Sequence, residues 1–136
     1  MKGYNAYLSF NGNCQQAMKF YADCFNGQIV SSETFGQSQG DKAKEADKDR
    51  VMHAEFKAEG MHLMASDGPS NYPHTPGNNV HLALDCSSTE EQDRVFNALA
   101  TNGQVDMPLS DTFWNARFGM VTDQFGIKWM LNYDKT

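Results

Sequence analysis

The 136-residue sequence lacks the features of membrane proteins and of nucleic-acid-binding proteins. No apolar run approaches the roughly 18 residues that a membrane-spanning helix needs. Lys and Arg number 11 against 17 Asp and Glu, and the net charge is −6. No basic cluster is present that could neutralise phosphates. We therefore expect neither a membrane nor a nucleic acid as partner.

Cysteine is also scarce, and its spacing excludes a zinc knuckle. The three cysteines are Cys14, Cys24 and Cys86, without a C-x-x-C pair. An odd number of separated thiols is typical of a reducing compartment. The first ten residues, MKGYNAYLSF, have no long apolar segment of the kind found in signal peptides. These features predict a cytoplasmic protein whose cysteines pack rather than react.

Two nearly identical turns indicate an internal repeat. NGQIV occupies residues 26–30 and NGQVD residues 102–106. An alternating apolar segment and a helical pattern precede each copy, and an extended segment follows. The Asn-Gly turns are 76 residues apart, whereas pairing Tyr7 with His81 in the preceding strands gives an offset of 74. Matched order as well as composition favours duplication, with about two residues inserted.

The hydrophobic pattern predicts one helix and four strands in each half, an α+β fold. Residues 1–67 form the first β-α-β-β-β module, 68–79 a Pro-rich linking loop and 80–136 the second module, all within a single domain. Residues 36–49 read as a solvated loop, and Asn13 as the cap of the first helix. The expected strands are 4–10, 28–35, 51–58, 61–66, 80–85, 104–109, 115–122 and 127–133, and the expected helices are 14–25 and 88–100.

Strand alternation separates a helix-facing row of apolar residues from a mixed row that faces either solvent or a ligand. Val80, Leu82 and Leu84 should pack under a helix. The opposite rows contain the candidate site residues of the strands, namely Asn5, Tyr7, His53, Glu55, His81 and Met130.

Three stretches carry a family resemblance: YLSFNGNCQQAMKFY, VMHAEF and FWNARFGMVTDQFGIKWMLN. They resemble the PhnB-like branch of the vicinal-oxygen-chelate superfamily, which includes glyoxalase I, bleomycin-resistance proteins and extradiol dioxygenases. The resemblance implies two modules side by side, a curved mixed sheet around a pocket, and a homodimer. That branch is often labelled as a ubiquinone methyltransferase. The Gly-rich, strand-to-helix turn of a nucleotide-binding methyltransferase is absent here.

The resemblance also implies four ligand positions for one divalent metal ion. By position they fall on Asn5, Met64, His81 and Met130. Only His81 is a competent ligand, because thioethers do not replace carboxylates around a hard or borderline ion. We therefore expect no metal cofactor; the alternative is a divalent site rebuilt from His53, Glu55, His62 and His81.

Two functions follow as hypotheses. The first is a small-molecule-binding protein for an apolar or aromatic compound, with Asn5, Tyr7, Met64, Trp114, Phe118 and Met130 as binding residues. The second is a lyase, isomerase or transferase that uses His81, His53 and Glu55 as catalytic residues. Trp129 reads as core, and Arg117 as the partner of either an anionic ligand, Asp111 or Asp123.

Overall fold

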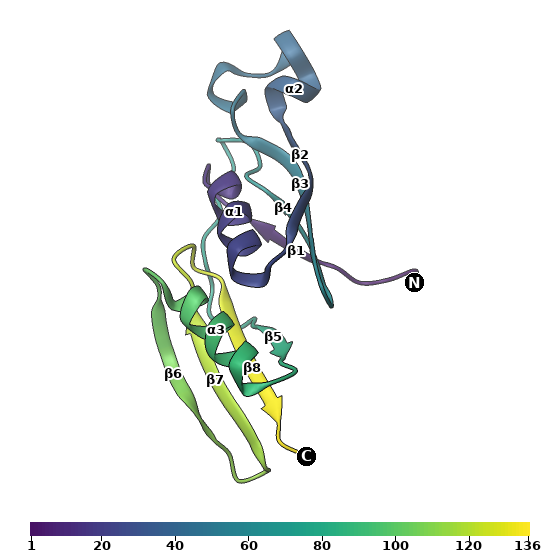
Figure 1. The fold of residues 1–136 in the computed structure, drawn as a ribbon. Helices are drawn as coiled ribbons and strands as arrows, with labels where there is room; N and C mark the ends of the chain where they lie inside the picture. Colours follow the sequence, from purple (N-terminus) through teal and green to yellow (C-terminus); the bar gives the residue numbers. More distant parts are fainter. The chain divides into compact units, whose positions relative to one another are not determined.

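The computed structural model describes all of residues 1–136, in two compact modules (Figure 1). The N-terminal module is Met1–Thr75 and the C-terminal module is Pro76–Thr136, so the division falls within the Pro-rich segment 68–79. None of the helices combines the length and the apolar character that crossing a membrane requires.

The N-terminal module is a four-stranded mixed sheet with one main helix. The sheet order is β1-β4-β3-β2; β1 pairs with β4 in parallel, and the other neighbours are antiparallel. Its elements are β1 (Ala6–Ser9), α1 (Cys14–Phe25), β2 (Gln28–Thr34), α2 (Phe35–Gln39), the 3-10 turns η1 (Gly40–Lys42) and η2 (Glu45–Asp47), β3 (Val51–Ala58) and β4 (Met61–Ser66).

The C-terminal module repeats this topology with a sheet of order β5-β8-β7-β6. Its β5 pairs in parallel with β8, as β1 does with β4. Its elements are β5 (Leu82–Asp85), α3 (Thr89–Ala100), β6 (Gln104–Asp111), β7 (Ala116–Thr122) and β8 (Lys128–Asp134). The α+β class and the β-α-β-β-β pattern of each half are therefore confirmed.

The repeat extends to the details of the Asn-Gly turns. Asn26 and Asn102 both adopt a left-handed backbone, with φ of 51° and 56°. The following glycines lie against a neighbouring strand, where a Cβ on Gly27 would come within 2.8 Å of the Lys57 carbonyl oxygen, and one on Gly103 would clash with that of Thr122. Only glycine fits this close approach. The two Asn-Gly turns therefore connect helix to strand in the same way in both modules.

The register corrects the expected offset between the first strands of the two halves. Tyr7 is the partner of Met64 on β4, and Ala83 is the partner of Met130 on β8. The equivalent of Tyr7 is thus Ala83, 76 residues later, so the predicted two-residue insertion between strand and turn is wrong. A short apolar strand can be shifted by two residues without losing its alternation, because the side-chain period is two.

Each helix covers one face of its sheet and leaves the other open. In the N-terminal module Leu8, Leu63, Ala54 and Phe56 are buried on the α1 side, with α1 contributing Met18 and Tyr21. In the C-terminal module the buried residues include Trp129, Leu131, Val121 and Leu99. These rows match the alternation. Val80 does not, because β5 begins only at Leu82 and leaves Val80 72% exposed.

Asp67, rather than Asn13, completes the N-terminus of α1. Asn13 makes no side-chain capping hydrogen bond. Asp67 follows β4 and is buried; its Oδ1 accepts from the backbone N–H groups of Gly12 and Cys14 at 2.8 and 2.9 Å, and its Oδ2 from that of Val51 at 2.8 Å. A carboxylate at a helix N-terminus satisfies free N–H groups and interacts favourably with the helix dipole. One buried side chain therefore ties α1 to both central strands.

The segment 36–49, expected to be an irregular loop, contains α2, η1 and η2. A reciprocal capping box starts α2: the Thr34 hydroxyl accepts from the Gln37 N–H at 3.1 Å, and the Gln37 side chain accepts from the Thr34 N–H at 2.8 Å. Ala43 and Asp47 are buried. The prediction failed because short helices held by caps and one or two buried residues have no periodicity to detect.

Candidate functional site

The open face of the N-terminal sheet carries a row of side chains that crosses all four strands. The register places Tyr7 beside Met64, Met64 beside Glu55, and Glu55 beside Ser31. Cross-strand partners project to the same face of a sheet. Tyr7 is 48% exposed, whereas its neighbour Leu8, which faces α1, is buried. This face combines an aromatic ring, a thioether and a carboxylate within one row.

Three hydrogen-bond contacts organise the polar groups of this face. The Tyr7 hydroxyl lies 3.3 Å from Nδ1 of His53. His62 is held between two oxygens, Oε2 of Glu55 at 2.7 Å from Nε2 and Oδ1 of Asn5 at 2.7 Å from Nδ1. The hydrogen bond from His62 is the largest cause of the lowered pKa of Glu55. Glu55 is thus paired with His62 on β4.

The sequence hypothesis placed Glu55 and His53, two residues earlier on β3, on one face as catalytic residues. In the structure their polar contacts differ, because Glu55 reaches sideways to β4 and His53 reaches toward Tyr7 on β1. Asn5 precedes β1, and its side chain contacts His62 rather than a residue at another of the four implied metal-ligand positions. The sequence pattern already placed His62 on the same face as Glu55. Only the pairing of β3 with β4 shows that the two side chains are in contact.

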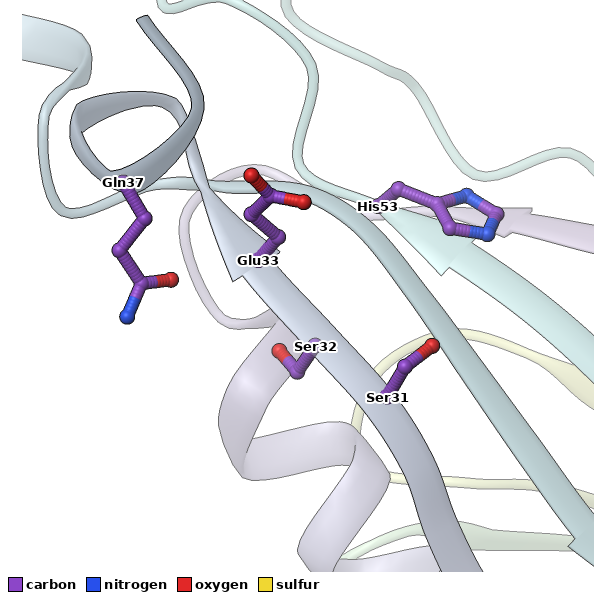
Figure 2. Close-up of a pocket in the computed structure, with 5 residues that line it drawn as sticks. All are labelled: Ser31, Ser32, Glu33, Gln37 and His53. Carbon is purple, nitrogen blue, oxygen red and sulfur yellow. The ribbon is translucent and has the colours of Figure 1, made fainter. Parts of the chain in front are cut away.

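An open pocket of about 370 Å³ lies where β2, β3 and α2 meet (Figure 2). Glu33 on β2 is the cross-strand partner of His53 on β3. The lining is polar and comprises Ser31, Ser32, Glu33, Gln37 and His53. Of these only His53 was expected in a site. The i, i+2 spacing of Ser31 and Glu33 on a predicted strand could have indicated that both face the same side. Gln37 could not have been found in this way, because it lies on α2, which the sequence pattern did not predict.

The open face of the C-terminal sheet is richer in apolar groups. Met130 lies between Ala83 and Met120, and Phe118 is the partner of Asn132. His81 is half-buried and stands immediately before β5, as Asn5 stands before β1. This module places Met130, Phe118 and Ala83 on one face, whereas His81 lies in a different module from His53 and Glu55.

The two tryptophans of the C-terminal module lie in different environments. Trp129 is fully buried, as expected for core, and its indole N–H donates to Oδ2 of Asp123 at 2.9 Å. Trp114 is 55% exposed in the turn between β6 and β7, and its ring stacks edge-on against that of Phe113, itself 97% exposed. An exposed aromatic pair of this size is consistent with a contact surface rather than with core.

Arg117 is engaged within its own module, but by a partner that the sequence did not indicate. Its guanidinium donates to Oδ1 of Asp93 on α3 at 2.8 Å and to Oε1 of the buried Gln92 at 3.3 Å. Asp111 pairs instead with Lys135 at 2.6 Å, and Asp123 accepts from the backbone of its own turn. The ion pair of Arg117 is therefore with Asp93 rather than with Asp111 or Asp123, although Asp111 is its cross-strand partner and Arg117 helps Lys135 to lower the pKa of Asp111.

Comparison with known proteins decides the family. The family model described as 3-demethylubiquinone-9 3-methyltransferase matches residues 3–132. The chain belongs to this family. It is 35% identical over 139 residues to Protein YjdN of Escherichia coli (strain K12), covering 95% of this chain and 93% of YjdN.

Solved structures show the same relationship. Protein PA1353 from Pseudomonas aeruginosa matches with a TM-score of 0.87 and 39% identity over 98% of both chains. A PhnB protein from Bacillus cereus matches with a TM-score of 0.78 and 30% identity, over 97% of this chain and 99% of that one. A glyoxalase/bleomycin resistance protein/dioxygenase domain from Frankia is 12% identical with a TM-score of 0.66 over 99% of both chains, which shows the fold. This chain is thus a PhnB-like member of the family, and it has a glyoxalase/bleomycin-resistance fold.

The residues do not fit a divalent metal of the kind that the fold implies. Of the four ligand positions, Asn5 is bound to His62, and Met64 and Met130 offer only neutral thioethers. No three His, Cys, Asp or Glu side chains lie close enough together to hold a metal ion. We therefore derive no chemistry through such an ion.

The family description names a methyl transfer, which requires a methyl-donor cofactor. The N-terminus of α1, the natural place for an anionic group in a strand-to-helix turn, is already filled by the Asp67 carboxylate. The turn FNGNC contains a single glycine. Neither feature fits a nucleotide-binding loop, so no methyl-transfer step follows from these residues.

Proposed function

We propose that the protein binds a small apolar or aromatic molecule on the open faces of its sheets. The observation that carries this proposal is the row Tyr7–Met64–Glu55, in which an aromatic ring and a thioether stand beside anchored polar groups. Aromatic and methionine side chains provide adaptable apolar contact, and a few fixed polar groups orient a ligand. Asn5, Phe118, Met130 and Trp114 are proposed to contribute further contacts, in a homodimer within a reducing cytoplasm.

The test is a thermal-unfolding screen of small aromatic and apolar compounds, followed by calorimetric titration of each hit. A ligand at about 100 times its Kd stabilises the native state by about 2.7 kcal/mol, a readily measured shift. Tyr7→Ser and Met64→Ser should weaken binding. Tyr72→Ser is the matched control, because Tyr72 is another exposed tyrosine and lies in the loop after β4, outside this row. Hits whose affinity is the same in all three variants would overturn the proposal.

A second function is favoured by the polar contacts on the same face. Glu55 orients His62, and His53 lies beside a tyrosine hydroxyl, so both pairs could move protons in a lyase, isomerase or transferase. Incubation of each ligand with the protein, analysed by mass spectrometry, separates the two functions. Conversion that is lost in His53→Gln or His81→Gln while binding persists would establish an enzyme. Ligand recovered unchanged leaves a binding protein.

A further inference from the structure

Three methionines stand next to one another on three adjacent strands of the C-terminal sheet. Met107 on β6 is the partner of Met120 on β7, and Met120 is the partner of Met130 on β8. The register shift between Val105 and Met107 brings Met107 into this line. Three of the eight methionines of the chain are therefore cross-strand neighbours in one sheet.

The three side chains share the open face. Their strand neighbours Val121, Trp129 and Leu131 are fully buried on the α3 side. Alternation therefore directs Met120 and Met130 away from α3. Met107 is 44% exposed, and Met120 and Met130 are half-buried. The row is accessible from solvent within the module.

The chemistry of this row is that of a soft, neutral ligand set. Cross-strand Cβ atoms are about 5 Å apart, and each methionine has three rotatable bonds with which to bring its sulfur toward a common centre. Thioethers select monovalent copper over hard divalent ions. Asp106, the residue before Met107, already accepts from the Thr122 hydroxyl and lies 3.8 Å from the Lys128 ammonium.

We propose that Met107, Met120 and Met130 form a binding site for a soft monovalent cation, Cu(I), with Ag(I) as its redox-stable equivalent. The site lies within one module and needs no partner subunit. It shares Met130 with the proposed small-molecule contacts, but it is argued from the register of β6, β7 and β8 alone.

The test uses the full chain in a Cys86→Ala background, because Cys86 is the one cysteine that is not buried. Burial raises the pKa of the Cys86 thiol to about 11, but a thiol still competes for soft ions. Silver nitrate is titrated into protein carrying 13C-methyl methionine, with calorimetry in parallel. We expect one equivalent to bind and to shift the three row methyl signals; Cu(I) should then bind under anaerobic competition with bicinchoninate.

Met120→Leu removes the central sulfur with little change of volume and should lower the affinity by about tenfold or more. Met61→Leu, which alters a half-buried methionine in the N-terminal module, is the matched control and should leave the affinity unchanged. Circular dichroism confirms that both variants fold. Equal affinity in Met120→Leu and the parent, or silver that shifts methionine signals without preference for the row, would overturn the proposal.

Discussion

His62 donates from Nε2 to Oε2 of Glu55 at 2.7 Å, across the antiparallel pair β3 and β4. The contact joins the two central strands on the open face of the N-terminal sheet. The carboxylate of Glu55 is stabilised in its ionised form by this hydrogen bond, which is why its pKa is lowered.

The first prediction concerns that carboxylate. In His62→Ala the pKa of Glu55 should return toward its ordinary value, because the largest cause of its depression is removed. A depressed folded-state pKa contributes stability above the unfolded pKa, which is lost as the pH falls through the folded pKa. This contribution to stability should therefore be lost in the acid range, and it should be absent from the variant at any pH. Carboxyl 13C NMR titration measures the pKa of Glu55; an unchanged Glu55 titration in His62→Ala would contradict the assignment.

The second prediction concerns the buried Asp67. Replacing it with Ala leaves the N–H groups of Gly12, Cys14 and Val51 without their acceptor. Unpaired buried donors and the loss of charge-assisted hydrogen bonds should lower the free energy of unfolding by about 3 kcal/mol or more. Urea denaturation monitored by circular dichroism measures the loss.

Asn13→Ala is the control for Asp67→Ala, because Asn13 occupies the conventional capping position of the same helix without forming the cap hydrogen bond. Its effect should stay within about 0.5 kcal/mol. A larger loss from Asn13→Ala than from Asp67→Ala would show that the helix is capped locally after all.

The third prediction concerns the repeated turn. A Cβ on Gly103 would clash with the carbonyl oxygen of Thr122, which is backbone and cannot rotate away. Gly103→Ala should therefore lower the free energy of unfolding by about 1–3 kcal/mol, as overpacking does. Gly77→Ala should be neutral, because its nearest neighbour would lie at 3.7 Å, an ordinary contact distance. Equal thermal stability of the two variants would argue against the close approach.

The fourth prediction concerns the exposed aromatic pair. If Phe113 and Trp114 belong to the surface of the proposed homodimer, the wild-type protein should sediment as a dimer. The double variant Phe113→Ser/Trp114→Ser should then sediment as a monomer with its secondary structure intact, since neither ring is buried within the module. Tyr72→Ser serves as control. A double variant that still sediments as a dimer would exclude this surface from the interface.

Local patterns were sufficient wherever a structural feature depends on neighbours in the chain. The first helix was predicted at residues 14–25 and occupies Cys14–Phe25, because its apolar face repeats with helical spacing. The strands 51–58 and 61–66 also match, because alternation and the Glu59-Gly60 turn define a hairpin without distant contacts. The assignment of Trp129 to the core followed from the same alternation.

The sequence by itself determined the α+β class, the repeated module and the identity of the open face, because periodicity and turn chemistry are local. Tertiary structure alone decided which residues meet on that face: His62 rather than His53 with Glu55, Asp93 rather than Asp111 with Arg117, and Asp67 rather than Asn13 at the helix cap. The physical reason is that alternation gives the face a side chain occupies, whereas strand order and register give its neighbour. Those depend on how segments far apart in the chain pair in space.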